Sequence, residues 1–410
     1  MPDSLFAAPA GTAVDHPSER SSNVVKPFHR IALVSAVIGL GASVAATSSV
    51  SHASETSDTS STGTCALSAI LEPCDNFVLF GARVMGYGDG TWQNQTLDAD
   101  SRYGRQVDVV HNYHAPDSVP VPLVHNANKP KSIGMQEEYF ATHGRILFLN
   151  FRAGNDWNEV ANTANKDDII DAAAENVARI KGSAKYKVML TLFHEPEDDA
   201  TSGGDDPDGD GSPGGSGCAE YKGDSKYPGN TPENYRKMWH KVQDRFKEKG
   251  ADNVVWVMTY QALEKWDCLT KAMWPGDDRV DWVGYDPYTR RPSGGLGDVT
   301  RFAQHLINSS DATHHFTDKP WILTEYGSVC EGNSQPAADF YDQVRGLIDA
   351  GTYPKLKGLL MFDVLNARSD YRTYYACPPS IDEPAPVDED EQKAFNRLAQ
   401  DELMFTLPKE

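Results

Sequence analysis

Two glutamates in this sequence stand at places where a strand-like apolar run comes to an end. His194 and Glu195 follow the apolar run at 187–193. Glu325 lies near the end of a similar run at 320–327. Two carboxyl groups can share acid–base work, because one can donate a proton to a leaving oxygen while the other attacks the reacting carbon or activates a water. Such a pair works only if the fold brings both side chains to one place.

Strand-like runs recur along the chain after residue 75. Most are continuous apolar runs, a pattern typical of strands that are covered on both faces. Helical patterns separate several of them, at 166–182, 231–250 and 335–351, and in the second of these Thr231 is a candidate N-cap followed by Pro232 in the first turn. The strand-like runs are 76–86, 106–113, 145–151, 187–193, 253–260, 279–285, 320–327 and 358–364.

The alternation of these strands with helices predicts the fold class. It implies parallel pairing and right-handed crossovers, and the most economical closure of eight such strands is a barrel. We therefore expect a single α/β domain over residues 76–410, a (β/α)8 TIM barrel. A doubly wound open sheet is the alternative, but no glycine-rich G-x-G-x-x-G segment follows the first strand-like run to support it.

A barrel of this kind carries its functional side chains at the C-terminal ends of its strands. Glu195 ends the fourth strand and Glu325 the seventh, so both are expected at a mouth that also receives aromatic residues. Facing carboxylates are what glycoside hydrolysis needs. Arg83, Tyr87, Asn112, Asp156 and Asp363 also lie at strand ends. The residues that we expect to bind the substrate there are His111, Arg152, Trp157, His194, Tyr260, Asp286 and Tyr288.

The same segments allow other interpretations. His194 and Glu195 could begin an H-E-x-x-H zinc motif, but position 198 is Asp and Pro196 disfavours a helix, so we expect no metal site. The acids at 197–199 are expected to form a solvated face. The segment 205–215 resembles the start of a calcium loop, but its twelfth position would be glycine where a bidentate Glu is required, which favours a flexible loop.

The N-terminal region predicts export. Lys26 and Arg30 precede a mostly apolar run at 31–46, and Ser51 and Ala53 supply the small residues that a signal peptidase prefers. We expect a signal peptide over 1–53, then a Ser/Thr-rich linker and a short disulfide loop over 54–75. The mature protein would be secreted. The apolar run is shorter than the ~20 residues that span a bilayer, which favours the signal peptide. An uncleaved membrane anchor is the alternative.

The six cysteines all follow the linker. An even count in an exported chain favours three disulfides, with free buried thiols as the alternative. Cys65–Cys74 would close a short local loop. Cys218–Cys268 and Cys330–Cys377 would each join neighbouring loops of the barrel. The sequence contains no C-x-x-C spacing, which disfavours a zinc site.

The composition bears on partners. The net charge of −21 argues against nucleic acid, whose phosphates need Lys and Arg, and is compatible with a neutral substrate. We expect a monomer that uses no cofactor and has no stable membrane partner.

Three segments of the sequence resemble glycoside hydrolase family 26. They are LFHEP at 192–196, WPGDDRVDWVGYDPY at 274–288 and PWILTEYGS at 320–328. The resemblance covers about residues 76–370 and implies a (β/α)8 retaining glycosidase. The best-known members are endo-β-1,4-mannanases, and others cleave mixed-linkage β-glucans or xylans. By this resemblance Glu195 is the acid/base, Glu325 the nucleophile and Tyr288 the tyrosine that hydrogen-bonds the nucleophile.

One segment departs from the family pattern. Mannanases of the family continue after the acid/base into a tryptophan-rich loop, whereas this chain has EDDATSGGDDPDGDG at 197–211. The catalytic pair is kept, but mannan specificity is left open. We expect a secreted retaining enzyme that cleaves a β-linked polysaccharide, β-mannan or β-glucan, by double displacement. The alternative is a secreted carbohydrate-binding barrel that has lost catalysis.

Overall fold

The computed structural model describes residues 65–87, 90–122, 133–201, 227–289, 296–328, 335–365 and 389–408. The predicted signal peptide, the candidate calcium loop at 205–215, and Cys218, Cys330 and Cys377 lie outside these ranges. Among the described residues, no helix combines the length and the apolar composition needed to cross a membrane.

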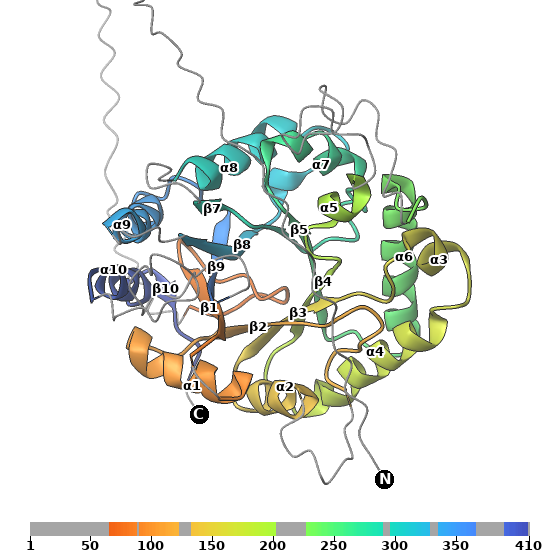
Figure 1. The fold of residues 1–410 in the computed structure, drawn as a ribbon, viewed down its shortest axis with the longest axis horizontal. Coiled ribbons are helices and arrows are strands. Elements are labelled where there is room, and N and C mark those ends of the chain that lie inside the picture. Colours follow the sequence, from red (N-terminus) through yellow and green to blue (C-terminus); the bar gives the residue numbers. More distant parts are fainter. Residues whose placement is uncertain are drawn as a thin grey trace, which may run out of the picture. The chain divides into compact units, whose positions relative to one another are not determined.

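Eight parallel strands of the described chain close into a barrel, which confirms the predicted fold class (Figure 1). Each strand pairs with the next one around the barrel, and β9 closes it by pairing with both β8 and β1. Each of the predicted strand-like runs overlaps one of these strands, although β8 ends one residue after its run and β9 begins two residues before its run. They are β1 Val78–Met85, β2 Val109–Tyr113, β3 Ile146–Phe151, β4 Val188–Leu192, β5 Val254–Tyr260, β6 Trp282–Tyr285, β8 Trp321–Ser328 and β9 Leu356–Val364.

Two short strands extend the sheet beyond the barrel. Strand β7, Tyr288–Thr289, pairs with the end of β8, and β10, Met404–Phe405, pairs with the start of β1. Strand β7 matters for the site, because it places Tyr288 beside the C-terminal end of the strand that carries Glu325.

Helices surround the strands (Figure 1). The predicted helices at 166–182, 231–250 and 335–351 are confirmed as α4 with η1, α6 and α9. The Thr231 side chain caps α6 by accepting a hydrogen bond of 3.2 Å from the Asn234 N–H. The α-helices are α1 Trp92–Tyr103, α2 Ile133–Thr142, α3 Trp157–Asn162, α4 Asp167–Arg179, α5 Pro196–Thr201, α6 Pro232–Glu248, α7 Leu269–Ala272, α8 Gly297–Ser309, α9 Gln335–Asp349 and α10 Glu389–Ala399, and the 3-10 helices are η1 Ile180–Gly182, η2 Glu264–Trp266 and η3 Phe316–Asp318.

The expectation that Pro196 opposes a helix is wrong. Helix α5 begins at this proline. A proline at the first helical position is tolerated, because the N–H that it lacks has no partner within the helix there. The turn that follows Glu195 is therefore a fixed helical turn and not an extended loop.

We call the half of the barrel interior that lies nearest the N-terminal ends of the strands the lower half, and the half nearest their C-terminal ends the upper half. The lower half is an apolar core. Inward-facing side chains near the starts of the strands pack together, and Leu71, Phe405 and Leu407 join them and close the N-terminal end. The loop that carries Leu71 is held by the predicted Cys65–Cys74 disulfide and by a hydrogen bond of 2.7 Å from the Trp282 indole N–H to the Ile70 carbonyl. Cys268 is also disulfide-bonded, while the predicted pairs Cys218–Cys268 and Cys330–Cys377 involve residues outside the described ranges.

Candidate active site

A cavity of about 500 Å³ opens at the C-terminal ends of the strands. Its walls mix apolar and polar side chains. Glu325 and His194 are part of its surface, together with Arg83, Met85, Tyr113, His114, Ala115, Pro116, Asn150, Arg152, Phe362 and Val364. The cavity therefore lies where function is expected in a barrel of this kind.

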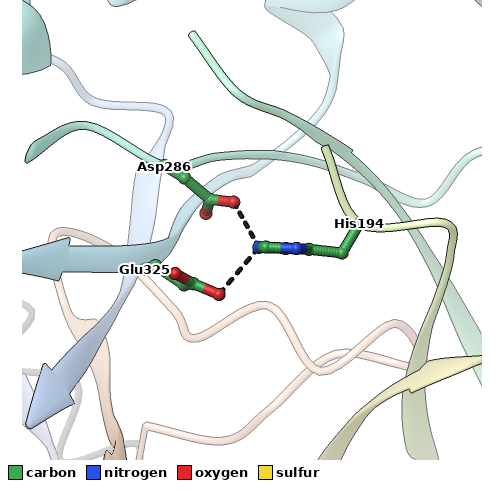
Figure 2. A group of neighbouring side chains, drawn as sticks. All are labelled: His194, Asp286 and Glu325. Atoms are coloured by element: carbon green, nitrogen blue, oxygen red, sulfur yellow. Dashed lines mark ion pairs between the residues drawn. The ribbon is translucent and has the colours of Figure 1, made fainter. Parts of the chain in front are cut away.

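His194 lies between two carboxylates at the centre of the site (Figure 2). Its Nε2 atom is 2.7 Å from an oxygen of Asp286 and 2.7 Å from an oxygen of Glu325. Burial alone would lower the pKa of His194, but the negative charges of Glu325, Asp286 and Glu195 raise this pKa well above its ordinary value. The imidazole is therefore a cation that pairs with both acids at neutral pH.

Glu325 is held as a carboxylate by several donors. The hydroxyls of Tyr113 and Tyr288 donate hydrogen bonds to its two different oxygens. Burial alone would raise the pKa of Glu325, but the charge and hydrogen bond of His194, with the Tyr113 hydrogen bond, lower it below the ordinary value. Glu325 is therefore an ionised side chain that faces the cavity in a fixed orientation.

The pKa of Glu195 is shifted in the opposite direction to that of Glu325. Burial raises the pKa of this carboxyl well above its ordinary value; the His194 charge opposes the rise, and the charges of Asp286 and Glu325 add to it. Its backbone has a φ of 52°, and the neighbouring Phe193 has a φ of 55°. Non-glycine residues adopt this left-handed region only where the surroundings impose it, and such residues concentrate at functional sites. The surroundings thus shift the pKa values of the two glutamates in opposite directions.

A protein-family model for glycosyl hydrolase family 26 matches residues 92–318. This chain belongs to glycosyl hydrolase family 26. It is therefore a glycoside hydrolase. The matched range includes Glu195 and ends shortly before Glu325.

Solved structures of family 26 enzymes have a similar fold. The catalytic domain of an endo-β-1,4-mannanase from Bacillus sp. JAMB-750 shares 15% identity and a TM-score of 0.56, over 81% of this chain and 88% of that one. A β-mannanase from Bacteroides ovatus shares 19% identity and a TM-score of 0.51, over 81% and 91%. The family 26 domain of an endo-β-mannanase/endo-β-glucanase from Prevotella bryantii shares 14% identity and a TM-score of 0.50, over 80% and 90%. No curated protein sequence matches this one significantly.

Two residues that we expected to bind substrate in this family 26 barrel lie elsewhere. Trp157 is fully buried and packs against Phe193 and Tyr235. Tyr260 is also fully buried, and its hydroxyl donates a hydrogen bond of 2.8 Å to the Thr270 carbonyl. Both side chains point into the layer between strands and helices, so these two expectations are corrected.

The other expected residues lie at or below the mouth. Arg152 is on the cavity surface and forms an ion pair of 3.2 Å with Asp199. His111 is fully buried beneath the mouth, where its ring packs against Tyr113. Asp286 and Tyr288 contact His194 and Glu325 respectively, as described above.

Several of the remaining strand-end residues have structural contacts. Tyr87 and Asp363 are hydrogen-bonded to each other beside β1, and Asp156 caps helix α3 by accepting from the Glu159 N–H. Arg83 lies on the cavity surface and donates a hydrogen bond of 2.7 Å to the Asn112 side chain.

Sequence reasoning missed Tyr113, which donates directly to Glu325. Its signal was available, because Tyr113 lies two residues after His111 and side chains two apart share one face of a strand. Sequence reasoning was also wrong about Glu197, which was expected on a solvated face. Glu197 is 1% exposed, because α5 turns it inward against β5.

His194, Asp286 and Glu325 could also each present one ligand atom to a metal ion, since these atoms lie within 4.8 Å of one another. In the structure the His194 Nε2 atom contacts both carboxylates directly. Contacts of this length fit a protonated Nε2 that pairs with both carboxylates.

Proposed function

We propose that this glycoside hydrolase cleaves a β-linked polysaccharide, β-mannan or β-glucan, by double displacement. Glu325 is the nucleophile and Glu195 is the acid/base. The observation that carries the proposal is the geometry at the strand ends, where Tyr113, Tyr288 and His194 contact the carboxylate of Glu325 and Glu195 directly follows His194. Burial raises the pKa of Glu195, and the partners of Glu325 lower its pKa, which fits the one protonated and one ionised carboxyl that a retaining glycosidase needs.

The first step forms a glycosyl–enzyme ester. A carboxylate oxygen of Glu325 attacks the anomeric carbon, and the bond from this carbon to the glycosidic oxygen breaks. The proton of Glu195 moves to the departing oxygen, which leaves Glu195 ionised. In the second step a water attacks the anomeric carbon, Glu195 takes a proton from that water, and the Glu325 carboxylate is released.

The neighbours of Glu325 support its role. The His194 cation, shared with Asp286, keeps the attacking carboxylate ionised although it is buried. The two tyrosine hydroxyls fix the plane of the carboxylate, so that it reaches the anomeric carbon in one orientation. Such prior alignment lowers the entropic part of the barrier.

The cavity supports an uncharged sugar chain as substrate. Met85, Ala115, Pro116, Phe362 and Val364 supply apolar surface for sugar C–H groups. The three solved structures reported above are mannanases, and one of them is also an endo-β-glucanase. The absence of tryptophan from the segment after Glu195 leaves β-glucan as an equal candidate. Export by the N-terminal 1–53 segment would deliver the enzyme to an extracellular polysaccharide.

A substrate panel tests the proposal. Reducing-sugar release is measured on β-mannan, lichenan, xylan and laminarin with the full chain. We expect release from mannan or from lichenan. Glu325→Ala and Glu195→Ala serve as matched blanks that keep the fold. Binding to one of these glycans with no release from any would contradict the proposal and favour the non-catalytic binding barrel.

A further inference from the structure

The turn that carries Glu195 is attached to the neighbouring strand by Glu197. An oxygen of the buried Glu197 side chain accepts a hydrogen bond of 2.9 Å from the backbone N–H of Gln261, the first residue after β5. The Gln261 side chain in turn donates a hydrogen bond of 2.7 Å to Asp198 and accepts one of 2.7 Å from the Trp266 indole N–H. Two consecutive acids of α5 are thus fixed to the end of β5.

The same turn is attached on its other side to β3. Asn150 accepts a hydrogen bond of 3.3 Å from the His194 backbone N–H, and Arg152 pairs with Asp199 at 3.2 Å. Glu195 lies between these two attachments in a left-handed backbone conformation. A non-glycine residue keeps that conformation only while the surrounding contacts impose it.

We propose that Glu197 is a positioning residue, which holds the acid/base Glu195 of the proposed function in its reactive orientation by fastening the β4–α5 turn to the end of β5. Glu197 touches no reacting atom in this scheme. It acts by fixing the backbone on which Glu195 is mounted. Placement errors of about 1 Å in a catalytic group can cost roughly 100-fold in rate.

The protonation state of Glu197 fits this role. Burial raises its pKa to about 8, hydrogen bonds from its own backbone N–H and from Gln261 oppose the rise, and the charges of Asp198 and Asp286 add to it. Among the described residues, Tyr235 of α6 and Tyr260 of β5 are also close to Glu197, and both are neutral at this pH. The attachment therefore adds no negative charge beside Glu195 at neutral pH.

A kinetic comparison tests the positioning role. Glu197→Ala removes the attachment, Glu197→Gln keeps the acceptor oxygen, and Glu233→Ala, at an exposed position of α6, is the control. kcat/KM is measured on the polysaccharide identified by the panel and on 2,4-dinitrophenyl β-mannobioside and β-cellobioside. The dinitrophenolate leaves without protonation, so its departure does not need a well-placed Glu195.

We expect Glu197→Ala to lower kcat/KM on the polysaccharide by about 10- to 100-fold and on the dinitrophenyl glycosides by less than about threefold. Glu197→Gln should stay within about threefold of the wild type on both substrates, because an amide oxygen can accept the Gln261 hydrogen bond. Equal losses on both substrates, or no loss on either, would overturn the proposal.

A second measurement is independent of activity. The folded protein keeps the Glu197 proton up to about pH 8, whereas the unfolded chain loses it near the ordinary value of 4.5, so the wild type loses stability as pH rises between these values. The melting temperature of Glu197→Gln should therefore rise relative to that of the wild type from pH 5 to pH 8. Above pH 8 the difference between the two melting temperatures should stay constant. Parallel curves throughout would show that Glu197 is not held neutral in its place and would overturn that part of the proposal. If the wild type hydrolyses no glycan, the proposed function fails, and this comparison still decides whether Glu197 is held neutral in its place.

Discussion

The lower and upper halves of the barrel interior are built by the same strands yet differ in chemistry. On β2, Val109 faces the apolar lower core, whereas Tyr113, four residues later on the same face, hydrogen-bonds the proposed nucleophile. On β8, Ile322 packs in the lower core, and Thr324 above it contacts Asp286. Alternation along the strand decides that these side chains point inward, and their height along the strand decides whether they pack in the apolar core or join the site.

Burial of side chains has opposite effects on the free energy of folding in the two halves. Removing apolar side chains from water in the lower half stabilises the fold. Burying ionisable groups in the upper half opposes their charged forms, and the fold tolerates this only because His194 pairs with two carboxylates and two tyrosines hydrogen-bond Glu325. Substitutions in the two halves should therefore give opposite patterns of lost activity and lost stability.

The largest effect is expected from the two glutamates of the upper half. Glu195→Ala should lower kcat on the polysaccharide by about 10²–10⁴-fold, the usual contribution of a general acid–base group, and Glu325→Ala by at least as much. The melting temperature should not fall in Glu195→Ala, and in Glu325→Ala it should fall only slightly, because His194 keeps its ion pair with Asp286. Azide should restore turnover of an activated aryl glycoside by replacing the missing carboxylate. Activity close to the wild type in either variant would refute the assignment.

The reverse pattern is expected from Ile146→Ala in the lower half. Ile146 is fully buried, so its truncation leaves a cavity and should lower the free energy of unfolding by about 2–5 kcal/mol. The kcat measured at 25 °C should stay close to that of the wild type. Denaturant titration and steady-state kinetics on the same preparation check both values. A large loss of kcat with unchanged stability would show that the two halves are not separable.

The loop that closes the lower half should contribute less. Cys65→Ser with Cys74→Ser opens the disulfide and should lower the free energy of unfolding by about 2–3 kcal/mol, as expected for a bridge that closes a short loop. The activity at 25 °C should not change. Thermal unfolding of the oxidised wild type and the double variant gives the comparison, and equal melting temperatures would show that the bridge does not secure this end of the barrel.

The smallest effect is expected from Tyr288→Phe in the upper half. Loss of this donor raises the pKa of Glu325, because one hydrogen bond to the charged form is gone. Glu325 must be ionised to attack, so activity is lost as pH falls through its pKa, and the acidic limb of the kcat/KM profile should move to higher pH. We expect roughly a tenfold decrease in kcat/KM at the optimum. An acidic limb at the wild-type position would contradict this account of Glu325.

The sequence predicted more of the barrel than of its mouth. Eight apolar runs predicted the eight strands, because parallel strands buried on both faces need continuous apolar segments. Glu195, Glu325, His194 and Asp286 were found because each lies at or just beyond a strand end. Nearness to a strand end does not say where a side chain points. Trp157 lies on α3 and points into the layer between strands and helices. Tyr260 points into the same layer, because it follows Thr259 directly and neighbouring residues of a strand face opposite sides.

The burial of Glu197 could not be predicted from its neighbours in sequence. Three consecutive acids after a strand are typical of a solvated surface. Glu197 is buried because α5 begins at Pro196 and turns this side chain inward to the backbone N–H of Gln261, which lies 64 residues away in the sequence. Contacts of this kind depend on the packing of two loops and leave no local pattern in the sequence.

Proton NMR of the first minutes of hydrolysis tests double displacement most directly. The substrate is the β-glycan on which the panel finds activity, and the anomeric signals of the newly formed reducing ends are followed from the start of the reaction. Attack by Glu325 followed by attack of water inverts the anomeric carbon twice, so the β-anomer should appear first and the α-anomer only later by mutarotation. Initial appearance of the α-anomer would mean a single displacement by water and would contradict the assignment of Glu325 as the nucleophile.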